Sequence, residues 1–119
     1  MKVEVECATC VLHRGYMEIL EATSDQALQF RAMTALTRLI SREFKPTAVP
    51  AKLGTKRDRL VKRVTGNSDP YEKKKWLSNK RALEILPQAK KFVASGSSPE
   101  AKFRRACLCA MVGNIIEFD

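Results

Sequence analysis

Residues 24–46, SDQALQFRAMTALTRLISREFKP, contain the clearest helical pattern in the chain. Apolar side chains recur there at i, i+3, i+4 and i+7, the spacing of one face of an α-helix. Ser24 and Asp25 offer N-cap oxygens, and Pro46 lacks the amide hydrogen that a helix interior requires. The segment therefore predicts an amphipathic helix whose buried face is made of Leu28, Ala32, Ala35, Leu36, Leu39 and Ile40.

Start and stop signals divide the rest of the chain into four further helical segments. A stripe of Leu12, Tyr16, Ile19 and Leu20 predicts a helix from about Cys7 to Ala22. Further helices are expected from Pro50 to Gly66, from Asp69 to Gly96 with Pro87 bending or breaking it, and from Ser98 to Gly113. No segment shows a β-strand pattern that would compete with this helical assignment. The expected fold class is all-α, a compact bundle of about five helices in residues 1–119.

Length and composition are those of one globular domain. The 119 residues can enclose a core, and 45% hydrophobic with 29% charged residues is a balance typical of folded proteins. No apolar run reaches the roughly 20 residues of a membrane-spanning helix, and the N-terminus lacks the apolar centre of a signal peptide. We therefore expect a cytoplasmic protein with no membrane partner.

The positive charge is concentrated after residue 44. Residues 1–44 hold five Lys/Arg and six Asp/Glu, whereas residues 45–119 hold 17 and seven and so carry a net charge of +10. Such a field can attract RNA, a phosphorylated small molecule or an acidic protein surface, and it is also found on solvated basic surfaces that bind nothing. Composition does not choose among these partners.

Apolar residues in the second half of the chain allow two interpretations. Tyr71 and Trp76 could form a surface for a partner, but their helical positions favour burial in the core. Phe103 and Met111 belong to an apolar face expected for the last helix. Beyond it, Ile115, Ile116 and Phe118 form an apolar cluster that has no element of its own to pack against.

This terminal cluster predicts one of three arrangements. It docks on a missing C-terminal domain or a partner subunit, it causes self-association, or it folds back onto the helices. A protein-interaction domain that docks through this tail is therefore one alternative function. A stand-alone basic helical module that binds RNA is another.

Three segments together resemble the damage-control phosphatase family, in particular its archaeal branch. They are the Cys7-Ala8-Thr9-Cys10 motif, the stretch TGNSDPY at residues 65–71, and GNIIEF at residues 113–118. The family was first known as a domain of unknown function and is also described through an acidic-residue methyltransferase-like member. The resemblance covers essentially the whole chain, and the second and third segments are much more specific than the first.

The resemblance implies that residues 1–119 are an N-terminal helical domain followed by a Rossmann-like α/β domain. That second domain would hold the catalytic divalent metal, Mn, Mg, Co or Ni, through ligands beyond residue 119. The implied activity is hydrolysis of phosphomonoesters such as sugar phosphates or damaged phosphometabolites. By itself the chain would then lack the catalytic machinery.

Two residues correspond to the family's Asn…Asp segment near the active-site cleft. They are Asn114 and Glu117, and the resemblance makes them candidates for the substrate pocket. Position 117 is Glu where Asp is more usual, so its carboxylate extends about one methylene farther from the backbone.

The cysteines leave two interpretations open. Cys7 and Cys10 share a helix face and could supply two thiolates to a structural Zn²⁺. Cys107 could join them or form a disulfide, whereas Cys109 would point about 200° away from Cys107. Alternatively, all four remain reduced and pack as small core residues, as free cysteines often do.

Overall fold

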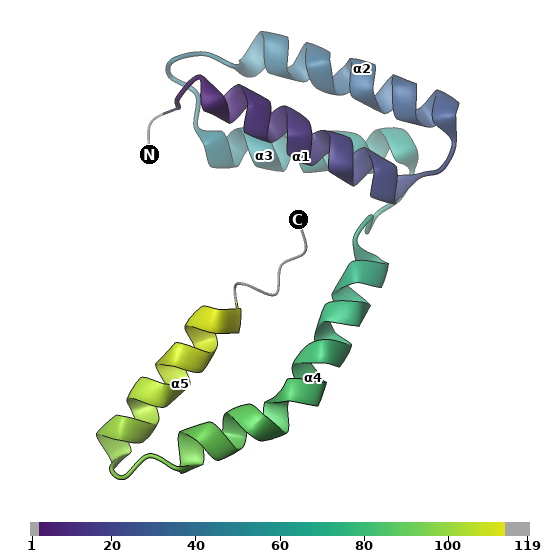
Figure 1. Ribbon diagram of the computed structural model, residues 1–119. Coiled ribbons are helices and arrows are strands. Elements are labelled where there is room, and N and C mark those ends of the chain that lie inside the picture. The colour runs from purple at the N-terminus through teal and green to yellow at the C-terminus, as the bar shows by residue number, and fades with distance from the viewer. Residues whose placement is uncertain (1–2, 114–119) are drawn as a thin grey trace. The chain divides into compact units, whose positions relative to one another are not determined.

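The computed structural model describes residues 3–113, and within them the chain is helical with no strand (Figure 1). Five helices follow one another: α1 (Glu6–Ala22), α2 (Gln26–Glu43), α3 (Pro50–Thr65), α4 (Glu72–Ala94) and α5 (Pro99–Gly113). The predicted all-α class and the five predicted helices are confirmed. None of the helices in the described part of the chain is long and apolar enough to cross a membrane.

Local capping chemistry sets the helix limits close to where the sequence predicts them. The Asp25 carboxylate accepts two backbone amides at 2.8 and 3.2 Å at the start of α2. Pro50 occupies the first turn of α3, and Gly66 ends that helix with a left-handed φ of 73°. Ser98 accepts the Ala101 amide at 3.1 Å where α5 begins.

The contacts divide the chain into two compact units, Met1–Tyr71 and Glu72–Asp119. In the first unit, α1, α2 and α3 pack against one another in pairs around an apolar core. Burial of such side chains contributes roughly 1.5–3 kcal/mol each. The core cluster consists of Ile19, Ala32, Leu36, Leu39, Leu60 and Val61. That residues 1–119 act as a single domain stays a prediction.

The predicted apolar face of α1 is correct only in part. Ile19 is buried and Leu12 packs against the core, but Tyr16 and Leu20 are 46% and 42% exposed. The buried side of α1 instead contains Val11, Gly15 and Glu18 beside Ile19. The difference arises because α2 and α3 both pack on α1, and their positions select which side of that helix is covered.

The second unit is a helical hairpin of α4 and α5 in which neither helix buries a residue. The expected burial of Trp76 is wrong, because 66% of it is exposed, and Phe103 is 72% exposed. Contacts between the two helices include the Arg105 guanidinium, which lies 5.0 Å from the Phe92 ring and donates to the Phe92 carbonyl at 2.9 Å. Two helices alone cannot cover these large apolar side chains.

Pro87 lies inside α4, which continues through it to Ala94. Figure 1 shows that the axis of α4 bends along its length. Proline removes one backbone hydrogen bond and crowds the preceding turn, so a bend at such a residue is expected. Of the two predicted outcomes, the helix bends and does not break.

Gly15 is where α1 approaches its neighbours most closely. A Cβ atom built at this position would collide with Leu36 Cδ2 of α2 and lie 3.0 Å from Arg57 Cδ of α3. The absence of a side chain therefore lets a core leucine and the stem of an arginine pack directly against the backbone of α1.

Gly15→Ala is expected to destabilise the protein by about 1–3 kcal/mol, because Leu36 and Arg57 must move to admit the methyl group. Gly54→Ala is the matched control: it also lies in a helix, but nothing approaches its Cβ position within 4 Å. This control should gain up to about 1 kcal/mol from helix propensity. Urea unfolding of both variants measures the difference, and equal effects at the two sites would contradict the close packing at Gly15.

Candidate functional site

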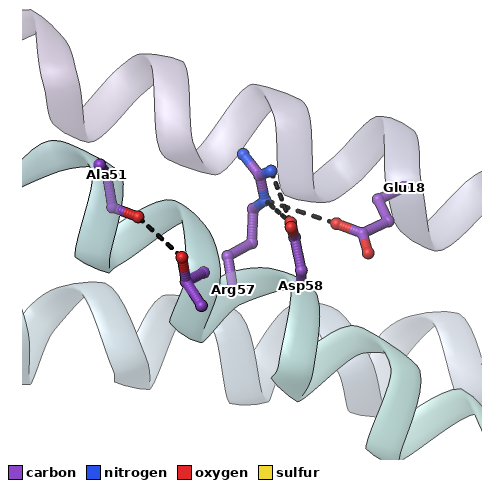
Figure 2. Close-up of polar contacts among 5 residues, drawn as sticks. Glu18, Ala51, Arg57 and Asp58 are labelled. Atoms are coloured by element: carbon purple, nitrogen blue, oxygen red, sulfur yellow. Dashed lines mark hydrogen bonds and ion pairs between the residues drawn. The ribbon is translucent and has the colours of Figure 1, made fainter.

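A buried carboxylate lies where α1 crosses α3. Glu18 is only 1% exposed, although it is charged at neutral pH in an ordinary environment. Its Oε2 atom lies 3.4 Å from Arg57 Nε, and Figure 2 shows the two side chains converging from the facing helices. A buried acid needs a compensating partner, and the Arg57 guanidinium supplies that positive charge.

Arg57 directs its hydrogen bonds to a second acid. Its Nε and Nη2 atoms donate to Asp58 Oδ1 at 3.0 and 2.6 Å (Figure 2). Glu18 Oε2 therefore has an ionic contact but no hydrogen bond. Two carboxyl groups share one guanidinium, so full ionisation of both would leave an uncompensated negative charge in the interior.

This arrangement favours the protonated form of Glu18. Burial first, and then the neighbouring Asp58 carboxyl, raise the pKa of its carboxyl from 4.5 to about 7, although Arg57 and Lys62 act in the opposite direction. Burial also raises the pKa of the Tyr71 hydroxyl, with the Glu18 carboxylate as the next cause. The cluster can therefore hold a proton near neutral pH.

The TGNSDPY stretch at residues 65–71 connects this cluster to the end of α1. Asn67 Nδ2 donates to the Ala22 carbonyl at 3.1 Å, and Asn67 Oδ1 accepts the Asp69 amide at 3.0 Å. Pro70 is buried. The Asn67 side chain therefore joins the turn between α3 and α4 to the end of α1. The turn also brings Tyr71 within electrostatic reach of Glu18.

The sequence did not reveal the Glu18, Arg57 and Asp58 cluster. One signal was present: Val11, Gly15, Glu18 and Ala22 follow one another at helical spacing, which places an acid among small and apolar residues on one face of α1. An acid within such a face indicates a buried polar partner on a neighbouring helix.

The predicted site residues that the structure describes are cysteines, and they lie outside the cluster of Glu18, Arg57 and Asp58. Asn114 and Glu117 fall outside the described residues. Cys7, at the start of α1, accepts the Glu4 amide through Sγ at 3.4 Å, and Cys10 is exposed one turn later. Cys107 is exposed in α5, which belongs to the second unit.

The four cysteines are free, and none of them is buried. Their expected burial as small core residues is therefore wrong, whereas a disulfide between Cys107 and the first pair stays a prediction. Across residues 3–113, no three His, Cys, Asp or Glu side chains come together in a group that could hold a metal ion. A zinc site built on Cys7 and Cys10 stays a prediction.

Comparison with known proteins identifies the family. Residues 3–119 match the family described as damage-control phosphatase ARMT1-like domain. The chain is 31% identical over 118 residues to an uncharacterized protein of Methanocaldococcus jannaschii and 29% identical to a damage-control phosphatase of Archaeoglobus fulgidus, covering 99% of this chain in both cases. It covers 38% and 40% of those two proteins.

A solved structure gives the same result. The crystal structure of a DUF89 family protein from Pyrococcus horikoshii matches the whole chain with a TM-score of 0.66 and 25% identity, over 46% of that protein. The present chain belongs to the damage-control phosphatase ARMT1-like family. It spans about two fifths of the length of the curated relatives that it matches.

Raising the pH is expected to destabilise the three-helix unit through Glu18. Because the folded-state pKa of about 7 lies above the ordinary value of 4.5, the folded protein holds this proton more tightly than the unfolded chain. The resulting stability is fully present below 4.5 and is lost as the pH rises through 7. By this linkage, the free energy of unfolding decreases by about 3 kcal/mol between acid and alkaline pH.

Glu18→Gln should flatten this dependence and make the protein more stable than the wild type at about pH 8, because an amide stays neutral. Urea unfolding followed by circular dichroism from about pH 5 to about pH 8 tests this expectation. Glu43→Gln is the control, since Lys56 and then Arg42 lower the pKa of that exposed carboxyl and its effect has the opposite sign. A Glu18→Gln variant that keeps the wild-type slope would contradict the assignment.

Proposed function

We propose that this chain is the helical part of a cytoplasmic, metal-dependent phosphatase that hydrolyses phosphomonoesters such as sugar phosphates or damaged phosphometabolites. The supporting observation is the family match over residues 3–119, together with relatives from Archaeoglobus fulgidus and Pyrococcus horikoshii that are named damage-control phosphatases. Since the chain covers 40% and 39% of those relatives, the activity would belong to a longer polypeptide.

The described residues do not fit the divalent metal that this function requires. Among residues 3–113, no group of three metal-binding side chains occurs. At the acid pair of Glu18 and Asp58, both carboxyl groups already have the Arg57 guanidinium as their cation. In this proposal, the metal ligands therefore come from the portion that the relatives have beyond the matched two fifths. There the metal would polarise the phosphoryl group.

The contribution of the helical part would be structural and electrostatic. The packed core of α1, α2 and α3 provides a rigid wall for a neighbouring pocket, and basic side chains favour the approach of a phosphorylated substrate. Asn114 and Glu117 remain the proposed contacts to the substrate.

The hairpin of α4 and α5 supports a docking role for the second unit. Its most exposed large apolar side chains are Trp76, Leu83, Phe103 and Met111, each at least 66% exposed. Such exposure is unusual for a stable soluble unit and is typical of surfaces that another part of the protein covers. We propose that the remaining domain of the full-length protein covers them, and that the isolated chain self-associates through them.

The longer polypeptide, with residues 1–119 joined to a second domain as long as that of the relatives, should release phosphate from sugar phosphates when Mn²⁺, Mg²⁺, Co²⁺ or Ni²⁺ is added. The 119-residue chain alone should release none above the buffer rate, because its described residues lack a metal-binding group. A phosphate-release assay with and without EDTA measures both. Metal-independent turnover by residues 1–119, or none by the longer protein across the panel, would contradict the proposal.

Trp76, the single tryptophan of the chain, reports on docking of the hairpin. In the chain alone its fluorescence should be quenched readily by acrylamide, because the side chain is 66% exposed. In the longer polypeptide, quenching should decrease and the emission should shift to the blue as the indole leaves water. Equal quenching in both proteins, with Phe103→Asp also leaving the oligomeric state of the short chain unchanged, would exclude docking and self-association through this surface.

A further inference from the structure

Four cations of α3 form one row along its exposed side. They lie at i, i+4, i+7 and i+11, so their directions around the helix axis differ by no more than about 60°. The row extends over about 16 Å at 1.5 Å per residue. Its members, all exposed, are Lys52, Lys56, Arg59 and Arg63.

A second row runs along α2. Arg31, Arg38 and Arg42 lie at i, i+7 and i+11 and are also exposed. The row has the same length as that of α3, and it flanks the apolar face through which α2 enters the core. Each of the two neighbouring helices thus carries a row of positive charge.

Contacts between α2 and α3 place the two rows on the same side of the unit. The helices pack against each other, and Glu43 joins their rows at one end by binding Lys56 at 2.7 Å and Arg42 at 3.1 Å. At the other end, a shallow groove is lined by α2 residues, including Arg31 and Arg38, together with Val64 of α3. The rows therefore follow one seam between the helices.

The groove adds an aromatic side chain to this charged face. Phe30 is 69% exposed at its edge, while Ala35 and Val64 contribute apolar lining. An exposed ring between cations is a platform on which a nucleobase can stack, and positive grooves with such platforms are how proteins hold single strands without sequence preference.

We propose that the α2–α3 face binds single-stranded nucleic acid, with the phosphates along the two cation rows and a base stacked on Phe30. Rows of regularly spaced cations suit a ligand whose anionic groups repeat along a strand. A membrane surface suits the face less well, because interfacial binding needs a broad apolar face and the groove offers one large exposed apolar side chain. This property is separate from phosphatase activity and requires no further domain.

Fluorescence anisotropy of a short labelled oligouridylate, titrated with the full 119-residue chain at about 50 to 200 mM salt, tests the proposal. Binding should weaken with salt by a log–log slope of about −0.7 for each phosphate contacted. Replacing Arg31, Arg38, Arg59 and Arg63 together by Gln should weaken binding more than tenfold at the low salt limit and reduce the slope. Phe30→Leu should weaken binding by about tenfold with the slope unchanged, because it removes stacking only.

The control variant replaces Lys73, Lys90, Lys91 and Lys102 of the second unit by Gln, which removes the same net charge. It should bind within about threefold of the wild type, since the effect of net charge alone is long-range and weak. Equal losses in the two four-site variants would overturn the proposal. So would tighter binding of poly-glutamate or of anionic vesicles than of oligouridylate. Circular dichroism of each variant verifies the helices, and the single change at Phe30 decides the outcome if the four-site variant unfolds.

Discussion

The close approach of three helices at Gly15 is the constraint on which the first unit depends. Leu36 from α2 and the stem of Arg57 from α3 both use space that a side chain at this position would fill. The lack of a side chain at Gly15 therefore affects both the apolar core and the polar cluster. The stem of Arg57 packs against Gly15, and its guanidinium contacts Glu18 and Asp58. The close approach of α2 and α3 to α1 at Gly15 therefore explains both the tight packing on that side of α1 and the burial of an acid there.

The two units differ in how they satisfy the hydrophobic effect. The first buries a cluster that includes Leu36, Val61 and Ile19, so its apolar surface is covered from within. Neither α4 nor α5 buries a residue, and both helices expose large apolar side chains, Trp76 and Phe103 among them. Two helices are too few to enclose a core, which supports the proposal that another surface covers this hairpin. The boundary between the two units, near Tyr71, therefore also separates a part that has its own apolar core from a part that has none.

Membership of the damage-control phosphatase ARMT1-like family is the basis for the proposal that the chain is part of a larger enzyme. In that proposal the described residues supply a wall, a charged surface and a docking hairpin, and the metal chemistry belongs to another part of the protein, because no metal-binding group occurs among residues 3–113. The acid pair has both of its carboxyl groups engaged by the guanidinium of Arg57. Its chemical property is the retention of a proton near neutral pH, which makes the stability of the unit depend on pH. The two cation rows of α2 and α3 add a charged surface whose proposed binding of nucleic acid is separate from phosphatase activity.

The sequence by itself determined the helix limits and the family. Asp25, Pro50 and Gly66 act through hydrogen bonds and dihedral angles within a few residues, so their effect is readable from local order. The tertiary structure alone decided which side of each helix is covered. Tyr16 and Trp76 have the spacing of core residues and remain exposed, whereas Glu18 is buried. Burial depends on the face that a neighbouring helix covers, and neither that face nor the meeting of two cation rows is fixed by the spacing within one helix.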